Sequence, residues 1–71
     1  MSKDSIRVEV TFLEKQGMSS VLDYVTADVK FETAMLMMKA DVVKVQGIRF
    51  KVNTSEVTAS GKLIFDKAEK L

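Results

Sequence analysis

The side chains that most often act as nucleophiles, bases and metal ligands are missing from this sequence, because it contains neither histidine nor cysteine. A serine nucleophile would then need a lysine as its base, and Ser55 and Ser60 have one nearby at Lys62. These residues fall in a polar stretch of small side chains, which is typical of a loop. The three glycines are isolated and do not form a phosphate-cradling loop. We therefore predict a protein that is not an enzyme and carries no cofactor.

Carboxylates could still supply acid–base chemistry or bind a cation. The acidic residues considered for this role are scattered along the chain: Asp23, Asp28, Glu32 and Asp41. Catalytic pairs need two carboxylates brought together, and calcium loops need alternating acids around a central glycine. The sequence shows no such spacing, and each of these residues fits a solvated surface. We expect no metal site and no small-molecule substrate.

Positive charge gathers in residues 42–52, where apolar and basic residues alternate on both sides of Gln46-Gly47. The pattern predicts a β-hairpin with a two-residue loop, although glutamine is not a favoured first turn residue and a slightly longer loop stays open. The candidate nucleic-acid contacts lie on its outer face, with one more on the same side of the sheet: Lys44, Arg49, Lys51 and Arg7. We favour the alternative, an ordinary solvated face whose cations keep a strand edge from pairing wrongly.

Strong helix formers occupy residues 31–40 and predict one helix of about three turns. Apolar residues spaced i, i+3, i+4 and i+7 predict its core-facing side: Phe31, Ala34, Met35 and Met38. Two further apolar residues lie off that side, and a third interrupts the alternation of the first strand. We predict that these three residues contact a second subunit or another protein: Leu36, Met37 and Leu13.

Period-two alternation of β-branched and polar residues predicts a strand over 6–14. Residues 19–30 fit either a strand or a helix, and their valine and threonine content favours the strand. A final strand is expected over 62–66, and a short one at 56–58 stays open. With the hairpin, these elements predict a small single α+β domain over Met1–Leu71. Its order is β-β-α-β-β-β, with one helix packed on an antiparallel sheet of four to five strands.

The expected core follows from the apolar faces of these elements. It comprises Val8, Val10, Phe12, Val25, Phe31, Met35, Met38, Val43, Val45, Ile48, Phe50 and Ile64. With 71 residues the core is small, so a partner subunit would add stability that disulfides cannot supply here.

Composition narrows the cellular setting. Eleven basic and ten acidic residues give a net charge of +1, which excludes a strongly basic tail but allows a local basic patch. No apolar run approaches the roughly 20 residues that a membrane helix needs, and the first residues lack the apolar segment of a signal peptide. We predict a cytoplasmic protein without a membrane contact.

Residues 31–52 contain a short helix, then Ala-Asp, then the pattern Val-x-Val-x-Gly-x-x-Phe-x-Val. This arrangement resembles many small proteins of bacteriophages and prophages. The resemblance implies a phage or bacterial source and no particular activity. The residues together predict a small non-enzymatic interaction or assembly module that self-associates, as a dimer or larger homo-oligomer, or binds another protein. The alternative is a nucleic-acid-binding protein that uses the basic hairpin.

Overall fold

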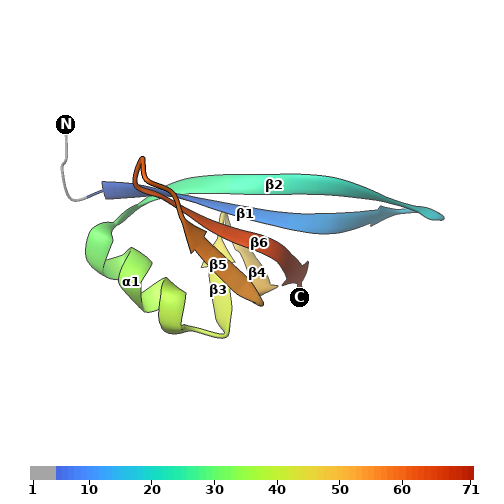
Figure 1. The fold of residues 1–71 in the computed structure, drawn as a ribbon. Helices are drawn as coiled ribbons and strands as arrows, with labels where there is room; N and C mark the ends of the chain where they lie inside the picture. Colours follow the sequence, from blue (N-terminus) through green and yellow to red (C-terminus); the bar gives the residue numbers. More distant parts are fainter. Residues whose placement is uncertain (1–4) are drawn as a thin grey trace.

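A long hairpin formed by the first two strands is the most extended part of the molecule (Figure 1). In this computed structural model, which describes residues 5–71, β1 spans Ser5–Gln16 and β2 spans Ser19–Lys30. They pair antiparallel without a register break, from Ser5 opposite Lys30 to Gln16 opposite Ser19. The prediction that residues 19–30 form a strand is confirmed.

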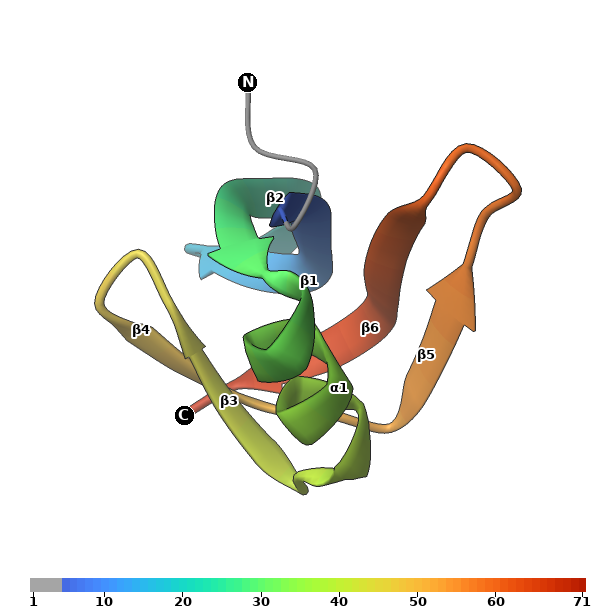
Figure 2. The same ribbon diagram turned by 90° about the vertical axis from the view of Figure 1, so that its left-hand side faces the viewer.

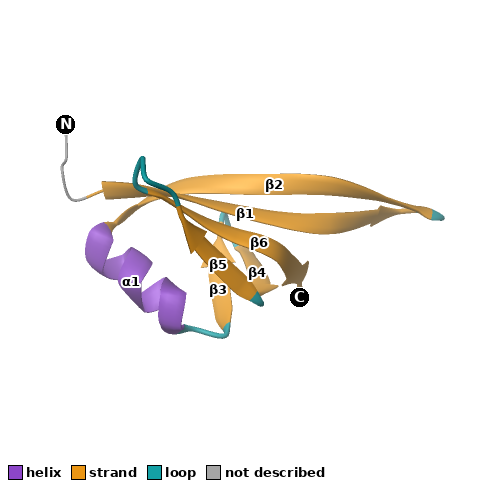
Figure 3. Cartoon of the chain, viewed as in Figure 1, coloured by secondary structure: helices purple, strands orange, loops and turns teal. Residues whose placement is uncertain are grey.

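The chain continues directly from β2 into a short helix, and four shorter strands follow. These elements are α1 (Phe31–Lys39), β3 (Val42–Val45), β4 (Ile48–Lys51), β5 (Thr54–Val57) and β6 (Lys62–Lys70). The observed order is the predicted one with one additional strand after the helix. The additional strand is β5, which corresponds to the short strand that the sequence left open at 56–58. The helix lies at the end of the molecule away from the hairpin tip (Figure 3). The result is a sheet-rich α+β fold.

The sheet is mixed and has six strands, so the prediction of an antiparallel sheet of four to five strands is wrong. The strand order is β2-β1-β6-β4-β3, and β5 pairs with β6 as well. β6 runs parallel to β1, from Lys62 opposite Arg7 to Phe65 opposite Val10. Figure 2 shows the sheet curving around α1, with β3 on one side and β5 on the other. Since β6 contacts three other strands, it is the centre of the fold.

A β-bulge in β6 lets that strand change partners. Val10 lies opposite Phe65 but Phe12 lies opposite Ala68, so β6 carries one more residue than β1 across this interval. Lys67 has a φ of 54°, in the left-handed region. Beyond the bulge, β6 turns away from β1 and pairs with β4 (Figure 1).

One cluster of apolar side chains fills the concave side of the sheet. Its buried members are Val8, Val10, Phe12, Ala34, Val43, Val45, Phe50, Leu63, Phe65 and Ala68. The rings of Phe12 and Phe50 lie 5.0 Å apart between centroids. The predicted core faces of β1, β3 and β4 are confirmed, while Val25 and Ile48 are partly buried and pack against the cluster.

The predicted core residue of the last strand is wrong. Ile64 is only partly buried, because it lies opposite Glu9 on the side of β1 that faces away from the core. Its neighbours Leu63 and Phe65 lie opposite Val8 and Val10, and these two side chains are fully buried.

The helix is rotated relative to the predicted orientation. Three residues assigned to the core are half exposed: Phe31 (53%), Met35 (46%) and Met38 (47%). Ala34 is buried as predicted, but Met37, which was expected to face outward, packs against the core. Since α1 begins at the residue after β2 ends, the path of the strand fixes the rotation of the helix. The small side chain of Ala34 then allows close packing on the sheet.

Candidate interaction surface

The outer half of the β1–β2 hairpin projects from the body of the protein as a two-stranded ribbon. Pairing of β1 with β6 ends where Phe12 lies opposite Ala68, so within residues 5–71 no third strand pairs with residues 13–22. We call these residues the arm. The arm accounts for the elongated shape, with principal extents of 43 × 21 × 21 Å (Figure 1). Two-stranded ribbons without further support are marginally stable in water, so the arm is the part of the fold that a partner would stabilise most.

Large apolar side chains meet on one face of this hairpin. Leu13 and Leu22 lie directly opposite each other, and they are 62% and 64% exposed. Tyr24 follows two residues after Leu22 on the same face of β2 and is 62% exposed. We call these three residues the arm face. Isolated exposed apolar residues are ordinary, but adjacent ones mark contact surfaces.

The outer edge of β2 is protected from pairing with another strand. The side chain of Gln46 donates a hydrogen bond to the carbonyl oxygen of Thr26 at 2.8 Å. The carboxylate of Asp23 accepts one from the backbone N–H of Tyr24, also at 2.8 Å. Both bonds occupy backbone groups that a further strand would need, which is a usual way of blocking edge-to-edge association. The blocked groups lie just beyond the arm, so this edge is protected where β2 joins the body of the protein.

A groove of about 680 Å³ lies beside the arm, between the arm face and the end of β6. We call it the arm groove. Its apolar lining comes from Leu13, Leu22 and Ala68. Its polar lining comprises Lys15, Asn53, Lys67, Glu69 and Lys70. Three lysines and one glutamate therefore border an apolar floor.

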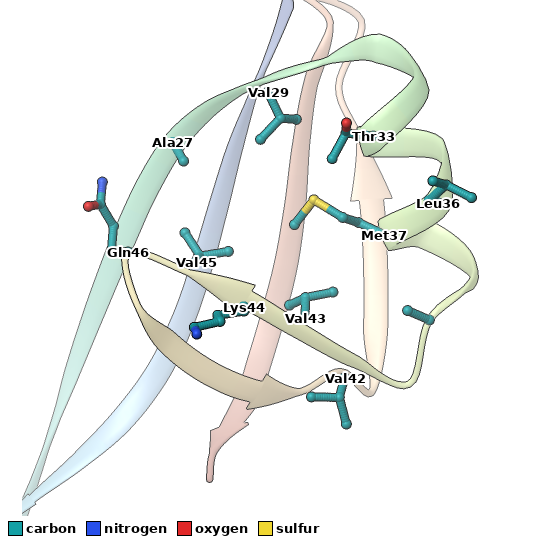
Figure 4. A pocket seen from close by; sticks show the side chains of 11 residues that line it. Ala27, Val29, Thr33, Leu36, Met37, Val42, Val43, Lys44, Val45 and Gln46 are labelled. Carbon is teal, nitrogen blue, oxygen red and sulfur yellow. The ribbon is translucent and has the colours of Figure 1, made fainter.

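The predicted interface residues do not come together. Leu13 lies in the arm, whereas Leu36 and Met37 line a separate pocket of about 320 Å³ between β2, α1 and β3. Figure 4 shows Met37 pointing toward Val43 and Val45, and Leu36 lying at the outer side of the helix. Leu36 is exposed, but Met37 belongs to the packing of the core.

Prediction from sequence missed two residues of the arm face. These are Leu22 and Tyr24, neither of which was among the predicted contact residues. The signal that could have found them is the hairpin register, because Leu22 falls opposite Leu13 once the turn is placed at Gly17.

The basic hairpin has the predicted geometry. Lys44 lies opposite Arg49, and the loop is the two-residue turn of Gln46 and Gly47, with φ angles of 54° and 76°. Both backbones are left-handed, as a type I′ turn requires. Lys51 lies opposite Glu69 of β6, so an acid borders the cations.

Arg7 does not join this group. It lies on β1, which β6 separates from the hairpin, and its guanidinium pairs with Asp28 at 3.3 Å. Within residues 5–71, none of the ion pairs includes Lys44, Arg49 or Lys51.

Comparison with protein-family models, with curated proteins and with solved structures gives no match. Across the described residues, no group of three or more acidic side chains is arranged to hold a metal ion. In the same part of the chain, no helix has the length and apolar character needed to cross a membrane.

Proposed function

We propose that this chain is a non-enzymatic protein-interaction module that makes its contact through the arm face. The observation that carries the proposal is the direct opposition of Leu13 and Leu22, both largely exposed on a ribbon that no other strand supports. Burying such side chains contributes about 1.5–3 kcal/mol each. A contact that covers the arm face would therefore gain several kcal/mol and would also hold the ribbon in place.

A second copy of the chain is the simplest partner, because an apolar face can pack against itself about a two-fold axis. A cytoplasmic location and a phage or prophage source are parts of this proposal that rest on the sequence alone. We do not propose an enzymatic function, because the sequence contains no histidine or cysteine.

The test is the molar mass in solution, measured by light scattering on a sizing column over a wide range of concentrations. We expect the wild type to form a dimer and the double variant Leu13→Ser/Leu22→Ser to stay monomeric. Leu71→Ser is the matched control, because Leu71 is 61% exposed but lies outside the arm. Equal masses for wild type and double variant at every concentration would exclude self-association through the arm.

The basic hairpin supports a second candidate, nucleic-acid binding. The supporting observation is the placement of Lys44 opposite Arg49, since like charges on facing residues destabilise a strand pair and suggest an external use. Binding to a labelled DNA or RNA duplex should then weaken steeply with salt, and Arg49→Glu should abolish it. Absence of binding at low salt would reject this candidate.

A further inference from the structure

The arm groove combines an apolar floor with more basic than acidic side chains. Lys70 is neutralised within the groove, because its ammonium contacts the carboxylate of Glu14 at 3.0 Å. Glu69 lies opposite Lys51 of β4, but the two do not form an ion pair within residues 5–71. Lys15 and Lys67 remain, and neither takes part in an ion pair among the described residues. Two lysines and one glutamate of the groove are therefore outside these ion pairs, which leaves an excess of positive charge beside the exposed leucines.

The backbone at the groove is also available for recognition. In β2, the carbonyl group of Thr26 points away from β1, since it accepts a hydrogen bond from Gln46. Thr26 lies opposite Glu9, so the backbone groups of Glu9 point away from β2. Antiparallel pairs alternate, so the odd-numbered residues of β1 turn their backbone groups away from β2, toward the side of β6. Lys15 lies beyond the last residue of β1 that pairs with β6. Its N–H and C=O thus face the groove without a strand partner.

These observations favour an extended peptide as the molecule that the arm groove binds. An extended peptide can satisfy the backbone of Lys15, as strands do when they add to an exposed edge. Side chains two positions apart in such a peptide point to the same side, and Leu13 and Lys15 share one face of β1 in the same way. An apolar side chain of the peptide would rest on Leu13 and Leu22, and the side chain two positions further along would reach the lysines. Acidic side chains would meet Lys15 and Lys67, and charge complementarity of this kind favours the correct partner over a basic one.

We propose that the arm groove binds an extended segment of a partner protein in which an apolar residue is followed two positions later by an acidic one. The inference rests on the proposed function, since it names the chemistry of the partner that the arm contacts. The segment lies along the end of β1, with its apolar side chains against the two leucines and its carboxylates at the two lysines.

The test uses two fluorescein-labelled nine-residue peptides, one with the repeat Leu-Ser-Glu-Ser and one with the repeat Leu-Ser-Lys-Ser, so that leucine and the charged residue share one face of the extended peptide. Fluorescence anisotropy measures their binding to the full chain. We expect the acidic peptide to bind at least about tenfold more tightly than the basic one, and the preference to shrink as salt rises. The double variant Lys15→Glu/Lys67→Glu should reverse the preference. The matched control Lys30→Glu/Lys39→Glu changes two exposed lysines outside the groove and should leave it intact.

The outcomes separate this inference from the proposed function. Equal binding of both peptides, lost in Leu13→Ser but not in the lysine double variant, would overturn the acidic specificity and leave the arm face as a contact. Failure of both peptides, together with arm-dependent dimers in light scattering, would overturn the inference alone. Failure of both peptides and an unchanged molar mass in the arm variants would overturn both. Equal binding of the acidic peptide to the groove variant and to the control variant would also overturn the inference.

Discussion

Thr11 of β1 holds the bulge of β6 in place through Lys67. The hydroxyl oxygen of Thr11 accepts a hydrogen bond from the backbone N–H of Lys67 at 3.0 Å. The same hydroxyl lies 3.1 Å from the carboxylate of Asp66, to which it donates. The Thr11 side chain thus accepts the hydrogen bond of the Lys67 N–H, which the bulge prevents from pairing with a neighbouring strand. The bulge in turn directs the end of β6 to β4 and leaves the arm without a third strand.

Replacement of Thr11 by valine should destabilise the protein by about 1–2 kcal/mol, because it leaves the N–H of Lys67 without its acceptor while keeping the shape of the side chain. Urea denaturation measures the effect. Thr26→Val is the matched control, since Thr26 lies on the same face of the hairpin and its hydroxyl makes no hydrogen bond in the described part of the chain. Equal losses in the two variants would contradict a specific role for Thr11.

Lys67 should tolerate glycine better than a β-branched residue. Its φ of 54° costs an L-amino acid about 1–2 kcal/mol, whereas glycine adopts this conformation freely. After allowing for the greater flexibility of glycine in the unfolded chain, Lys67→Gly should gain about 0.5 kcal/mol and Lys67→Val should lose more than about 1 kcal/mol. Thermal unfolding of the two variants checks the order. The reverse order would be incompatible with a left-handed residue at the bulge.

The rotation of α1 predicts opposite sensitivities at two positions of the helix. Ala34 is 2% exposed and touches the core, so Ala34→Leu should cost about 1–3 kcal/mol through overpacking. Met38 is 47% exposed, and Met38→Lys should change stability by less than about 0.5 kcal/mol. Chemical denaturation of both variants provides the comparison. If Met38→Lys unfolded the protein while Ala34→Leu did not, the helix would face the core with Met38 and not with Ala34.

Backbone amides in the arm should exchange with solvent faster than those of the body. Between residues 13 and 22 no side chain is buried, whereas Val8 and Val10 are fully buried in the same strand. Local opening of the ribbon therefore needs little free energy compared with opening of the core. Hydrogen exchange followed by NMR at residue resolution measures both regions in one sample. Equal protection at Leu13 and Val10 under conditions where the protein is monomeric would contradict this expectation.

Local patterns were sufficient to predict the hairpin and the buried side of β1. Val43 and Phe50 face the core because the two-residue turn fixes which residues lie opposite each other, and the sequence contains that turn. Val8, Val10 and Phe12 alternate with polar residues, so a single buried face was the simple interpretation.

Features that depend on distant parts of the chain were not predictable in the same way. The parallel pairing of β6 with β1 decides that Leu63 and Phe65, and not Ile64, face the core, and nothing within 62–66 indicates that partner. The bulge at Lys67 depends on a hydroxyl from β1 and has no local turn signal. Leu13 was recognised as unusual from its own strand, but its place on the arm face needed the register with Leu22.

The parallel contact between β1 and β6 also has a consequence for how quickly the native state can form. Thr11 and Lys67 are separated by 56 positions in a chain of 71, and β1 finds no partner on its inner edge until β6 has been made. Contacts between such distant segments slow folding, because the intervening loop must close before they stabilise anything. During synthesis, the inner edge of β1 therefore stays unpaired until β6 has left the ribosome.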